Sequence, residues 1–144
     1  MKGFGFFREQ AQSMGSELSI HEVIQNQASA NEMRIAAYLS HGTGLMSAEE
    51  LVRDVLDPEQ PVIGTLTLMT DGEWIWPADL AHYVGKYHVK IHDGLLQHME
   101  DNGWECPKPT LAELAAMQRS IMGNPAGTIS TNRGGPSGHV SFCV

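Results

Sequence analysis

The chain has few cysteines, few basic residues and no long apolar run, and each shortage excludes a class of protein. Cys106 and Cys143 are the only cysteines in 144 residues, so a disulfide-rich secreted scaffold is excluded and both thiols are expected to stay reduced. Nine Lys and Arg residues accompany seventeen Asp and Glu, for a formal net charge of −8, whereas a nucleic-acid surface needs clustered cations. No stretch approaches the ~20 apolar residues of a membrane span, and the apolar start is too short for a signal peptide. We therefore expect a cytoplasmic protein that binds neither nucleic acid nor membrane.

Recognisable catalytic and cofactor motifs are also missing. The glycine-rich stretch 134–138 lacks the Gly-Lys-Ser/Thr ending of a phosphate-binding loop. Cys106 follows Glu105, and a nearby carboxylate raises the pKa of a thiol, which opposes its use as a nucleophile. Asp71 and Asp79 are explained by a turn and by a helix start, respectively, rather than by acid and base chemistry. We expect no catalytic residue and no cofactor.

Four histidines within one short interval are the remaining candidates for chemistry, because neutral imidazole is a common metal ligand. They are His82, His88, His92 and His98. A zincin-like site would need two histidines four apart on a helix with an acid after the first, but Val89 follows His88. We predict ordinary histidines and no metal site. A small metal-dependent hydrolase that uses the His82–His98 cluster is the enzymatic alternative.

The length predicts a single domain with one core. Residues 17–123 carry the patterns of regular structure. Residues 1–16 combine three phenylalanines with glycines and polar residues, as in an arm that packs on the domain or on a partner, or that frays. Residues 124–144 form a tail rich in Gly, Pro and Ser, and the alternation over 139–144 indicates a terminal strand.

The centre of the chain predicts a hairpin followed by a helix. Two leucines alternate with polar residues before Asp71-Gly72, and Trp74 and Trp76 alternate after it, so Gly72 occupies a tight turn that requires positive φ. Pro77 suits the first turn of a helix, and Asp79 complements the helix dipole. One face of that helix carries Leu80, Tyr83, Val84 and Tyr87.

Ser/Thr-x-x-Glu patterns typical of capping boxes predict further helix starts. They occur at Ser19/Glu22, Ser29/Glu32, Ser47/Glu50 and Thr110/Glu113. The third predicts a helix that Asp57-Pro58 ends; the alternative is a short strand at Gly44–Met46 followed by an irregular acidic loop. Asp93 is expected to cap another helix that Asn102-Gly103 ends. We predict an α+β fold with four to six helices on one face of a small antiparallel sheet. The sheet is built from the hairpin at Asp71-Gly72, and the terminal strand is a possible further member.

The acidic residues between 49 and 59 have one basic neighbour, Arg53. Such a run is either a solvated face or a surface for a basic partner. Trp74 and Trp76 lie two apart on one side of a predicted strand, and they either pack in the core or anchor a partner. Both pairs of alternatives remain open from the sequence.

The stretch Thr70–Val84, which reads TDGEWIWPADLAHYV, and the following Tyr87-His88-Val89 resemble a recurring segment of small bacterial proteins. These proteins are similar to immunity proteins of contact-dependent or polymorphic toxin systems, which bind and neutralise a cognate toxin. The resemblance covers about Asp54 to Trp104. It departs at His92, where a proline is expected, and the glycine-rich tail has no counterpart.

The resemblance implies a non-catalytic protein that neutralises a basic toxin through an acidic surface. The residues expected to contact the toxin are Glu49, Glu50, Asp54, Asp57, Glu59, Asp71, Glu73, Trp74 and Trp76. A structural module that oligomerises through the phenylalanine-rich arm and the tail is a third possibility. The sequence leaves the oligomeric state open.

Overall fold

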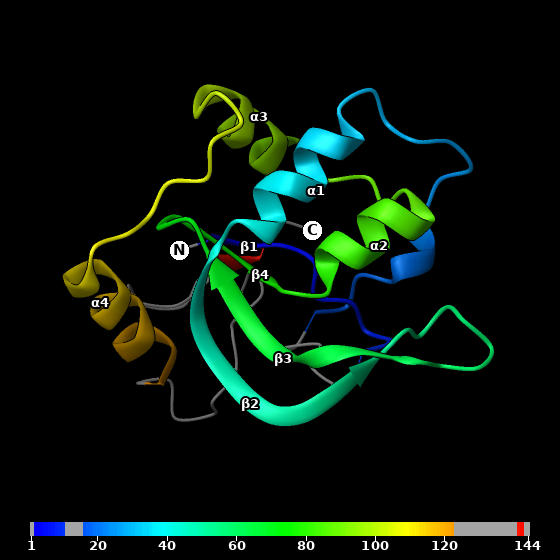
Figure 1. The fold of residues 1–144 in the computed structure, drawn as a ribbon, viewed down its shortest axis with the longest axis horizontal. Helices are drawn as coiled ribbons and strands as arrows, with labels where there is room; N and C mark the ends of the chain where they lie inside the picture. The colour runs from blue at the N-terminus through cyan, green and yellow to red at the C-terminus, as the bar shows by residue number, and fades with distance from the viewer. Residues whose placement is uncertain (1, 11–15, 123–140, 143–144) are drawn as a thin grey trace.

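The computed structural model describes residues 2–10, 16–122 and 141–142 (Figure 1). Within these residues the chain forms four α-helices, one 3-10 helix and five strands, so the α+β class is confirmed. In chain order the elements are β1 (Lys2–Gly3), η1 (Ile20–Glu22), α1 (Glu32–Ser40), β2 (Thr43–Arg53), β3 (Val62–Thr70), β4 (Trp74–Pro77), α2 (Leu80–Tyr87), α3 (Asp93–Asp101), α4 (Leu111–Met122) and β5 (Ser141–Phe142).

The sheet is mixed rather than antiparallel. Its strand order is β2-β3-β4-β1-β5, and the two hairpin pairs, β2 with β3 and β3 with β4, are antiparallel. β1 runs parallel to both β4 and β5. The antiparallel prediction was wrong here because no hairpin joins β1 to its neighbours, so no tight turn sets its direction. β5 lies within the predicted terminal strand 139–144, and the rest of the predicted tail lies outside the described residues.

The predicted hairpin at Asp71-Gly72 is confirmed. Thr70 pairs with Ile75 across the turn, and Gly72 has a φ of +104°, which a residue with a Cβ rarely adopts. Pro77 does not start the following helix as predicted. It is the last residue of β4 and pairs with Leu68, and α2 begins three residues later because Ala78 still donates its backbone N–H to the β3 ladder at Thr67.

The helix predicted from the Ser47/Glu50 pattern does not form. Thr43–Arg53 is instead β2, which pairs antiparallel with β3. It contains the short strand of the alternative prediction, Gly44–Met46, but extends through the acidic residues that this alternative placed in an irregular loop. The Ser47 hydroxyl lies 3.2 Å from the Thr67 hydroxyl across the two strands rather than on a helix N–H. Pairing with β3 and burial of Leu45 and Val52 outweigh the local helix preference of the glutamates.

The remaining helix boundaries follow the predicted caps in part. The Thr110/Glu113 box forms with both reciprocal bonds at the start of α4. Ser19/Glu22 also forms its box, but it starts only the 3-10 turn η1. Ser29 provides no side-chain cap, since α1 begins after Asn31, and α3 is capped by the His92 ring rather than by Asp93.

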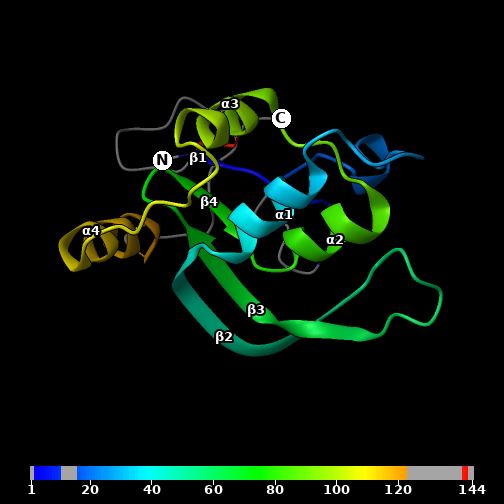
Figure 2. The same cartoon turned by 45° about the horizontal axis from the view of Figure 1, so that its top comes forward.

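Two apolar clusters pack on opposite faces of the sheet. Trp74 and Trp76 point into the larger one, under α1, α2 and α3, whereas Ile75 between them points into the smaller one with Met117 and Ile121 of α4. Figures 1 and 2 show α1 to α3 grouped together and α4 apart from them, beside the start of β2. The helices therefore cover both faces, not one.

The N-terminal segment belongs to the folded domain. Phe4, Phe6 and Phe7 are buried in the two clusters, and Arg8 N–H donates to Leu18 O at 2.9 Å. Residues 2–10 therefore pack on the domain, which is one of the alternatives predicted for the N-terminal arm. None of the described helices has the length and apolar character needed to cross a bilayer.

Candidate functional site

Three exposed carboxylates lie on the long hairpin of β2 and β3. These strands form a curved ribbon that arches away from the helices (Figures 1 and 2). Glu49 and Glu50 lie in the middle of β2, Glu59 lies in the connection to β3, and all three are exposed. Among the described residues, none forms a salt bridge with these three side chains. They are the exposed members of the acidic run between residues 49 and 59.

A bulge in β2 carries two of these glutamates. In the ladder, Ser47 pairs with Thr67 and Leu51 pairs with Thr65, so Ala48, Glu49 and Glu50 lie opposite the single residue between those threonines. The five residues from Ser47 to Leu51 are all exposed, and we call this stretch the open edge. Bulges of this kind re-aim side chains and occur often beside functional sites.

Asp54, at the end of β2, is a structural residue with a fully buried side chain. Its Oδ2 lies 2.8 Å from His82 Nε2, accepts from the Tyr87 hydroxyl at 2.9 Å and lies 3.4 Å from Lys86 Nζ. Its Oδ1 accepts the backbone N–H groups of Leu56 and Asp57. We call Asp54, His82, Lys86 and Tyr87 the Asp54 cluster, and it ties the hairpin to α2.

Electrostatics keep Asp54 ionised. Burial raises its pKa, but hydrogen bonds from His82, the Leu56 N–H and Tyr87 outweigh burial and lower the pKa to about 2. Asp57 is partly exposed and lies 3.3 Å from Lys86. The pKa of Lys86 is raised by its contacts with Tyr87 and Asp57. Of the five predicted contacts in this segment, Asp54 is therefore inaccessible and Asp57 is neutralised locally.

Asp71 has a similar structural role in the β3–β4 turn. Its Oδ1 accepts the N–H groups of Glu73 and Trp74, both at 2.9 Å. Its Oδ2 accepts the Tyr38 hydroxyl at 2.5 Å and lies 3.0 Å from His98 Nε2. We call Asp71, Tyr38, His98 and the adjoining Asn102 the Asp71 cluster. Asp71 is buried, whereas the Glu73 side chain is 74% exposed, so only Glu73 is accessible at this turn.

The Asp71 cluster opposes nucleophilic chemistry at its neighbours. Burial raises the pKa of Tyr38, and its hydrogen bond to Asp71 raises it further. Burial and the charge of Asp71 raise the pKa of Cys106 to about 11. The predicted direction for Cys106 is thus correct, although the responsible carboxylate is Asp71 rather than its sequence neighbour.

Both tryptophans lie in the core. Trp74 and Trp76 are 2% and 0% exposed, and the Trp76 indole N–H donates to Leu39 O at 3.1 Å. The interpretation of the pair as core packing is confirmed. Neither indole is accessible to anchor a partner on the folded surface, which corrects their inclusion among the contact residues.

The four histidines do not converge. His82 contacts Asp54, His88 Nδ1 lies 2.6 Å from Glu32, His92 caps α3, and His98 contacts Asp71. Within the described ranges, no group of three or more His, Cys, Asp or Glu side chains could hold a metal ion. The described geometry therefore offers no support for the hydrolase alternative.

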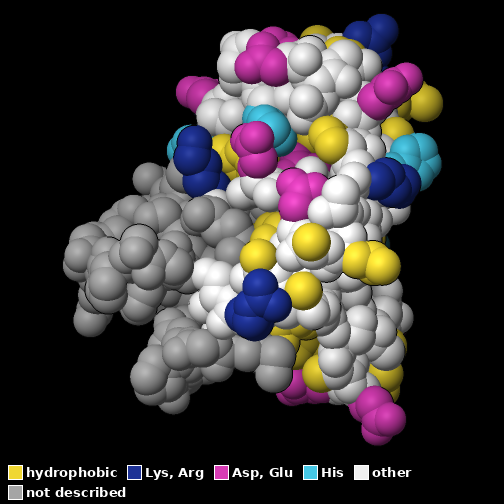
Figure 3. Space-filling model, turned by 90° about the vertical axis from the view of Figure 1, so that its left-hand side faces the viewer, with side chains coloured by type: hydrophobic (Ala, Val, Ile, Leu, Met, Phe, Trp, Pro, Cys, Tyr) yellow, Lys and Arg dark blue, Asp and Glu magenta, His cyan; other side chains and the backbone are white. Residues whose placement is uncertain are grey.

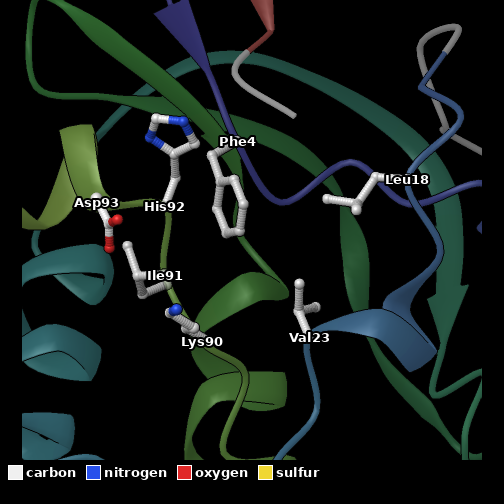
Figure 4. Close-up of a pocket in the computed structure, with 7 residues that line it drawn as sticks. All are labelled: Phe4, Leu18, Val23, Lys90, Ile91, His92 and Asp93. Carbon is white, nitrogen blue, oxygen red and sulfur yellow. The ribbon is translucent and has the colours of Figure 1, made fainter.

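A shallow depression of about 210 Å³ lies between the N-terminal segment and the connection from α2 to α3 (Figure 4). Phe4, Leu18 and Val23 form one side of it, and residues 90–93 form the other. The Nδ1 atom of His92 in this depression accepts the Gly94 N–H. The depression therefore presents mainly apolar walls with Lys90 and Asp93 at the rim, and it lacks convergent polar groups that would orient a substrate.

The face that carries α4 has a mixed character. Hydrophobic side chains there are interspersed with basic and acidic ones (Figure 3), and Leu111 is exposed at the start of α4. This contrasts with the open edge, whose charged side chains are acidic. A basic partner is therefore matched better by the open edge than by the face shown in Figure 3.

Sequence reasoning found the accessible glutamates but missed the strand that carries them. The Ser47/Glu50 pattern and the helix preference of Ala and Glu concealed β2, and only the β-branched and apolar residues that flank the bulge indicated a strand. It also missed the two carboxylate clusters, whose members are distant in sequence.

No protein-family model, curated protein or solved structure matches this chain.

Proposed function

We propose that this protein is a non-catalytic binding protein that neutralises a cognate basic toxin through the acidic hairpin of β2 and β3. The observation that carries the proposal is the exposure of Glu49, Glu50 and Glu59 on one ribbon, without a salt bridge to any described residue. Exposed carboxylates steer a cationic partner toward its docking surface and accelerate the encounter.

The Asp54 cluster supports the proposal because it makes the ribbon a defined surface. Asp54 joins the end of β2 to α2 through His82 and Tyr87, and the Tyr83 hydroxyl donates to Arg53 O and accepts the Val55 N–H. A ribbon held at its end loses less conformational entropy when it binds than a free one. The net charge of −8 adds long-range attraction for a cationic protein.

The first test is capture of the partner and measurement of neutralisation. Tagged protein is purified from its native lysate, and a captured basic polypeptide is then produced alone and together with this chain. We expect the polypeptide to arrest growth alone and growth to recover on co-expression. A captured protein that leaves growth unchanged, or whose toxicity this chain does not relieve, would contradict the proposal.

Charge reversal tests the surface. The triple variant Glu49→Lys/Glu50→Lys/Glu59→Lys is expected to lose neutralisation and to weaken binding at low salt by about two orders of magnitude or more, since reversed charges both remove attraction and add repulsion. The matched control is Glu17→Lys/Glu100→Lys/Glu105→Lys, which changes three other exposed glutamates by the same charge. Equal losses in both triple variants would show that net charge, not this surface, determines binding.

A further inference from the structure

β2 is an end strand of the sheet, and its middle is exposed. Near its start, Leu45 O accepts the side-chain amide of Gln118 from α4 at 2.8 Å. Beyond its end, Asp54 N–H donates to Pro61 O, just before β3, at 3.0 Å, so this bond closes the hairpin on its inner side. Between them lies the open edge, Ser47–Leu51, at the margin of the sheet. An uncovered strand edge is a template for another strand.

The bulge in β2 makes the open edge a better template for another strand. The register gives Ala48, Glu49 and Glu50 no paired residue on β3, although all three belong to β2. A bulge leaves surplus backbone groups outside the ladder, and backbone N–H and C=O groups require a partner, either water or another chain. The open edge therefore presents extended backbone that β3 does not satisfy.

The charges of the open edge determine which kind of strand can pair with it. Proteins often protect sheet edges with lysine, but here Glu49 and Glu50 directly precede Leu51, which is 56% exposed. A second copy paired on the same edge would place like charges against each other, which destabilises a strand pair. A segment that alternates basic and apolar side chains would instead present one basic face, which can pair with a glutamate of the open edge.

We propose that a basic extended segment of the partner adds to Ser47–Leu51 as an additional strand. The inference rests on the proposed function and specifies its mode of binding, by backbone hydrogen bonds for affinity and by side-chain charge for selection. It goes beyond charge attraction because it requires the backbone of the partner to be extended and able to donate and accept hydrogen bonds.

Two synthetic peptides test the requirement for a strand. One alternates Lys and Val, and the other alternates Lys and Pro with the same length and charge but lacks every second N–H. We expect the Lys-Val peptide to bind about tenfold or more tightly than the Lys-Pro peptide, and to slow hydrogen exchange at the amides of Ala48–Leu51 in the intact protein. Equal affinities without protection of these amides would overturn the inference.

Proline substitutions in β2 test whether backbone N–H groups of the open edge take part in binding. Ala48→Pro and Glu49→Pro each remove one N–H, and consecutive N–H groups of a strand point to opposite sides, so at least one should remove a donor from the open edge. Proline is tolerated at edge strands and bulges. We expect one of them to weaken Lys-Val binding by about tenfold, while Glu49→Gln, the charge control, weakens it less. Emission of the buried Trp74 and Trp76 reports that each variant is folded.

The same variants separate this inference from the proposed function. If the captured toxin is neutralised by both folded proline variants but not by the triple charge reversal, the function stands and the strand addition is overturned. If light scattering shows a dimer that the proline variants dissociate, the occupant is a second copy and the inference is likewise overturned. Loss of neutralisation in a folded proline variant, with protection of Ala48–Leu51 by the toxin, supports it.

Discussion

β3 is shared by two hairpins that differ in burial, length and use of acidic side chains. The β3–β4 hairpin is short, and its β4 strand is buried along its whole length, with Trp74 and Trp76 on one face and Ile75 on the other. The β2–β3 hairpin is long, and its middle is exposed over Ser47–Leu51. The first hairpin is part of the core, whereas the second has surface that the fold does not use.

The comparison also separates two kinds of carboxylate. Asp54 and Asp71 are buried and accept several hydrogen bonds each, so their charges are used internally. Glu49 and Glu50 are exposed on the bulge. A buried charge without partners would be costly, which explains why donors surround the two aspartates, whereas the exposed glutamates are solvated.

The largest expected difference between the hairpins is in apolar packing. Trp76→Ala should lower the free energy of unfolding by about 3–5 kcal/mol, because it leaves a cavity in the larger cluster and an unpaired Leu39 carbonyl. Leu51→Ala, at a side chain that is 56% exposed, should cost about 0.5 kcal/mol. Urea denaturation measures both, and similar costs would show that the open edge is packed in solution.

The next difference concerns the buried carboxylate that holds the long hairpin. Asp54→Asn should lower the free energy of unfolding by about 2–3 kcal/mol, since the amide replaces one charged acceptor and places a donor against the Tyr87 hydroxyl and His82. Asp57→Asn removes a partly exposed ion pair with Lys86 and should cost less than about 1 kcal/mol. Equal losses would show that Asp54 is solvated.

Acid should remove the contribution of Asp54 to the free energy of unfolding. Its pKa is about 2 in the folded protein against an ordinary value of 3.8, so the unfolded state binds the proton more readily. The stabilisation, roughly 2 kcal/mol, is present above about pH 4 and is lost as the pH falls through 2. We expect the difference in unfolding free energy between the unmodified protein and Asp54→Asn to shrink over this range. A difference that is constant with pH would contradict the assignment.

Two nearby glycines allow a smaller matched comparison. A Cβ at Gly42 would lie 2.6 Å from Trp76 Cζ2, whereas a Cβ at Gly44 would meet nothing within 4 Å. Gly42→Ala should therefore destabilise the protein by about 1–2 kcal/mol through displacement of the indole. Gly44→Ala, in a strand, should change stability by about 0.5 kcal/mol or less and in the stabilising direction. Thermal unfolding of the two variants decides between these expectations.

The smallest expected effect is at the open edge itself. Glu49→Gln/Glu50→Gln should change the free energy of unfolding by about 0.5 kcal/mol or less, because both side chains are exposed without a salt bridge to a described residue. The same double variant should weaken binding of a basic partner. A large loss of stability would show that these glutamates serve the fold, and calorimetry on the free protein measures it.

Local patterns in the sequence were sufficient where a segment's own chemistry agreed with its surroundings. The turn at Gly72 and the capping box of Thr110 were predicted because positive φ and reciprocal side-chain bonds are local requirements. β2 was mispredicted because its glutamates favour a helix locally, while the stabilisation of the strand comes from pairing with β3. Strand pairing joins residues that a local pattern does not connect.

Only part of the predicted contact surface is exposed in the folded chain. Glu49, Glu50, Glu59 and Glu73 are exposed, as a binding surface requires, but Asp54 and Asp71 are buried. The difference cannot be inferred from the acidic run, because the donors to Asp54 come from α2 and those to Asp71 come partly from α1. Burial of a carboxylate depends on donors that only the folded chain brings together.

The sequence by itself determined the acidic charge, the β3–β4 turn, the apolar face of α2 and the start of α4, because each depends on residue types at short spacing. Only the tertiary structure decided that Thr43–Arg53 is an end strand with a bulge, that β1 enters the sheet in parallel, and which carboxylates are buried. These features depend on contacts between segments far apart in the chain, and their free energy is gained only when those segments pack together.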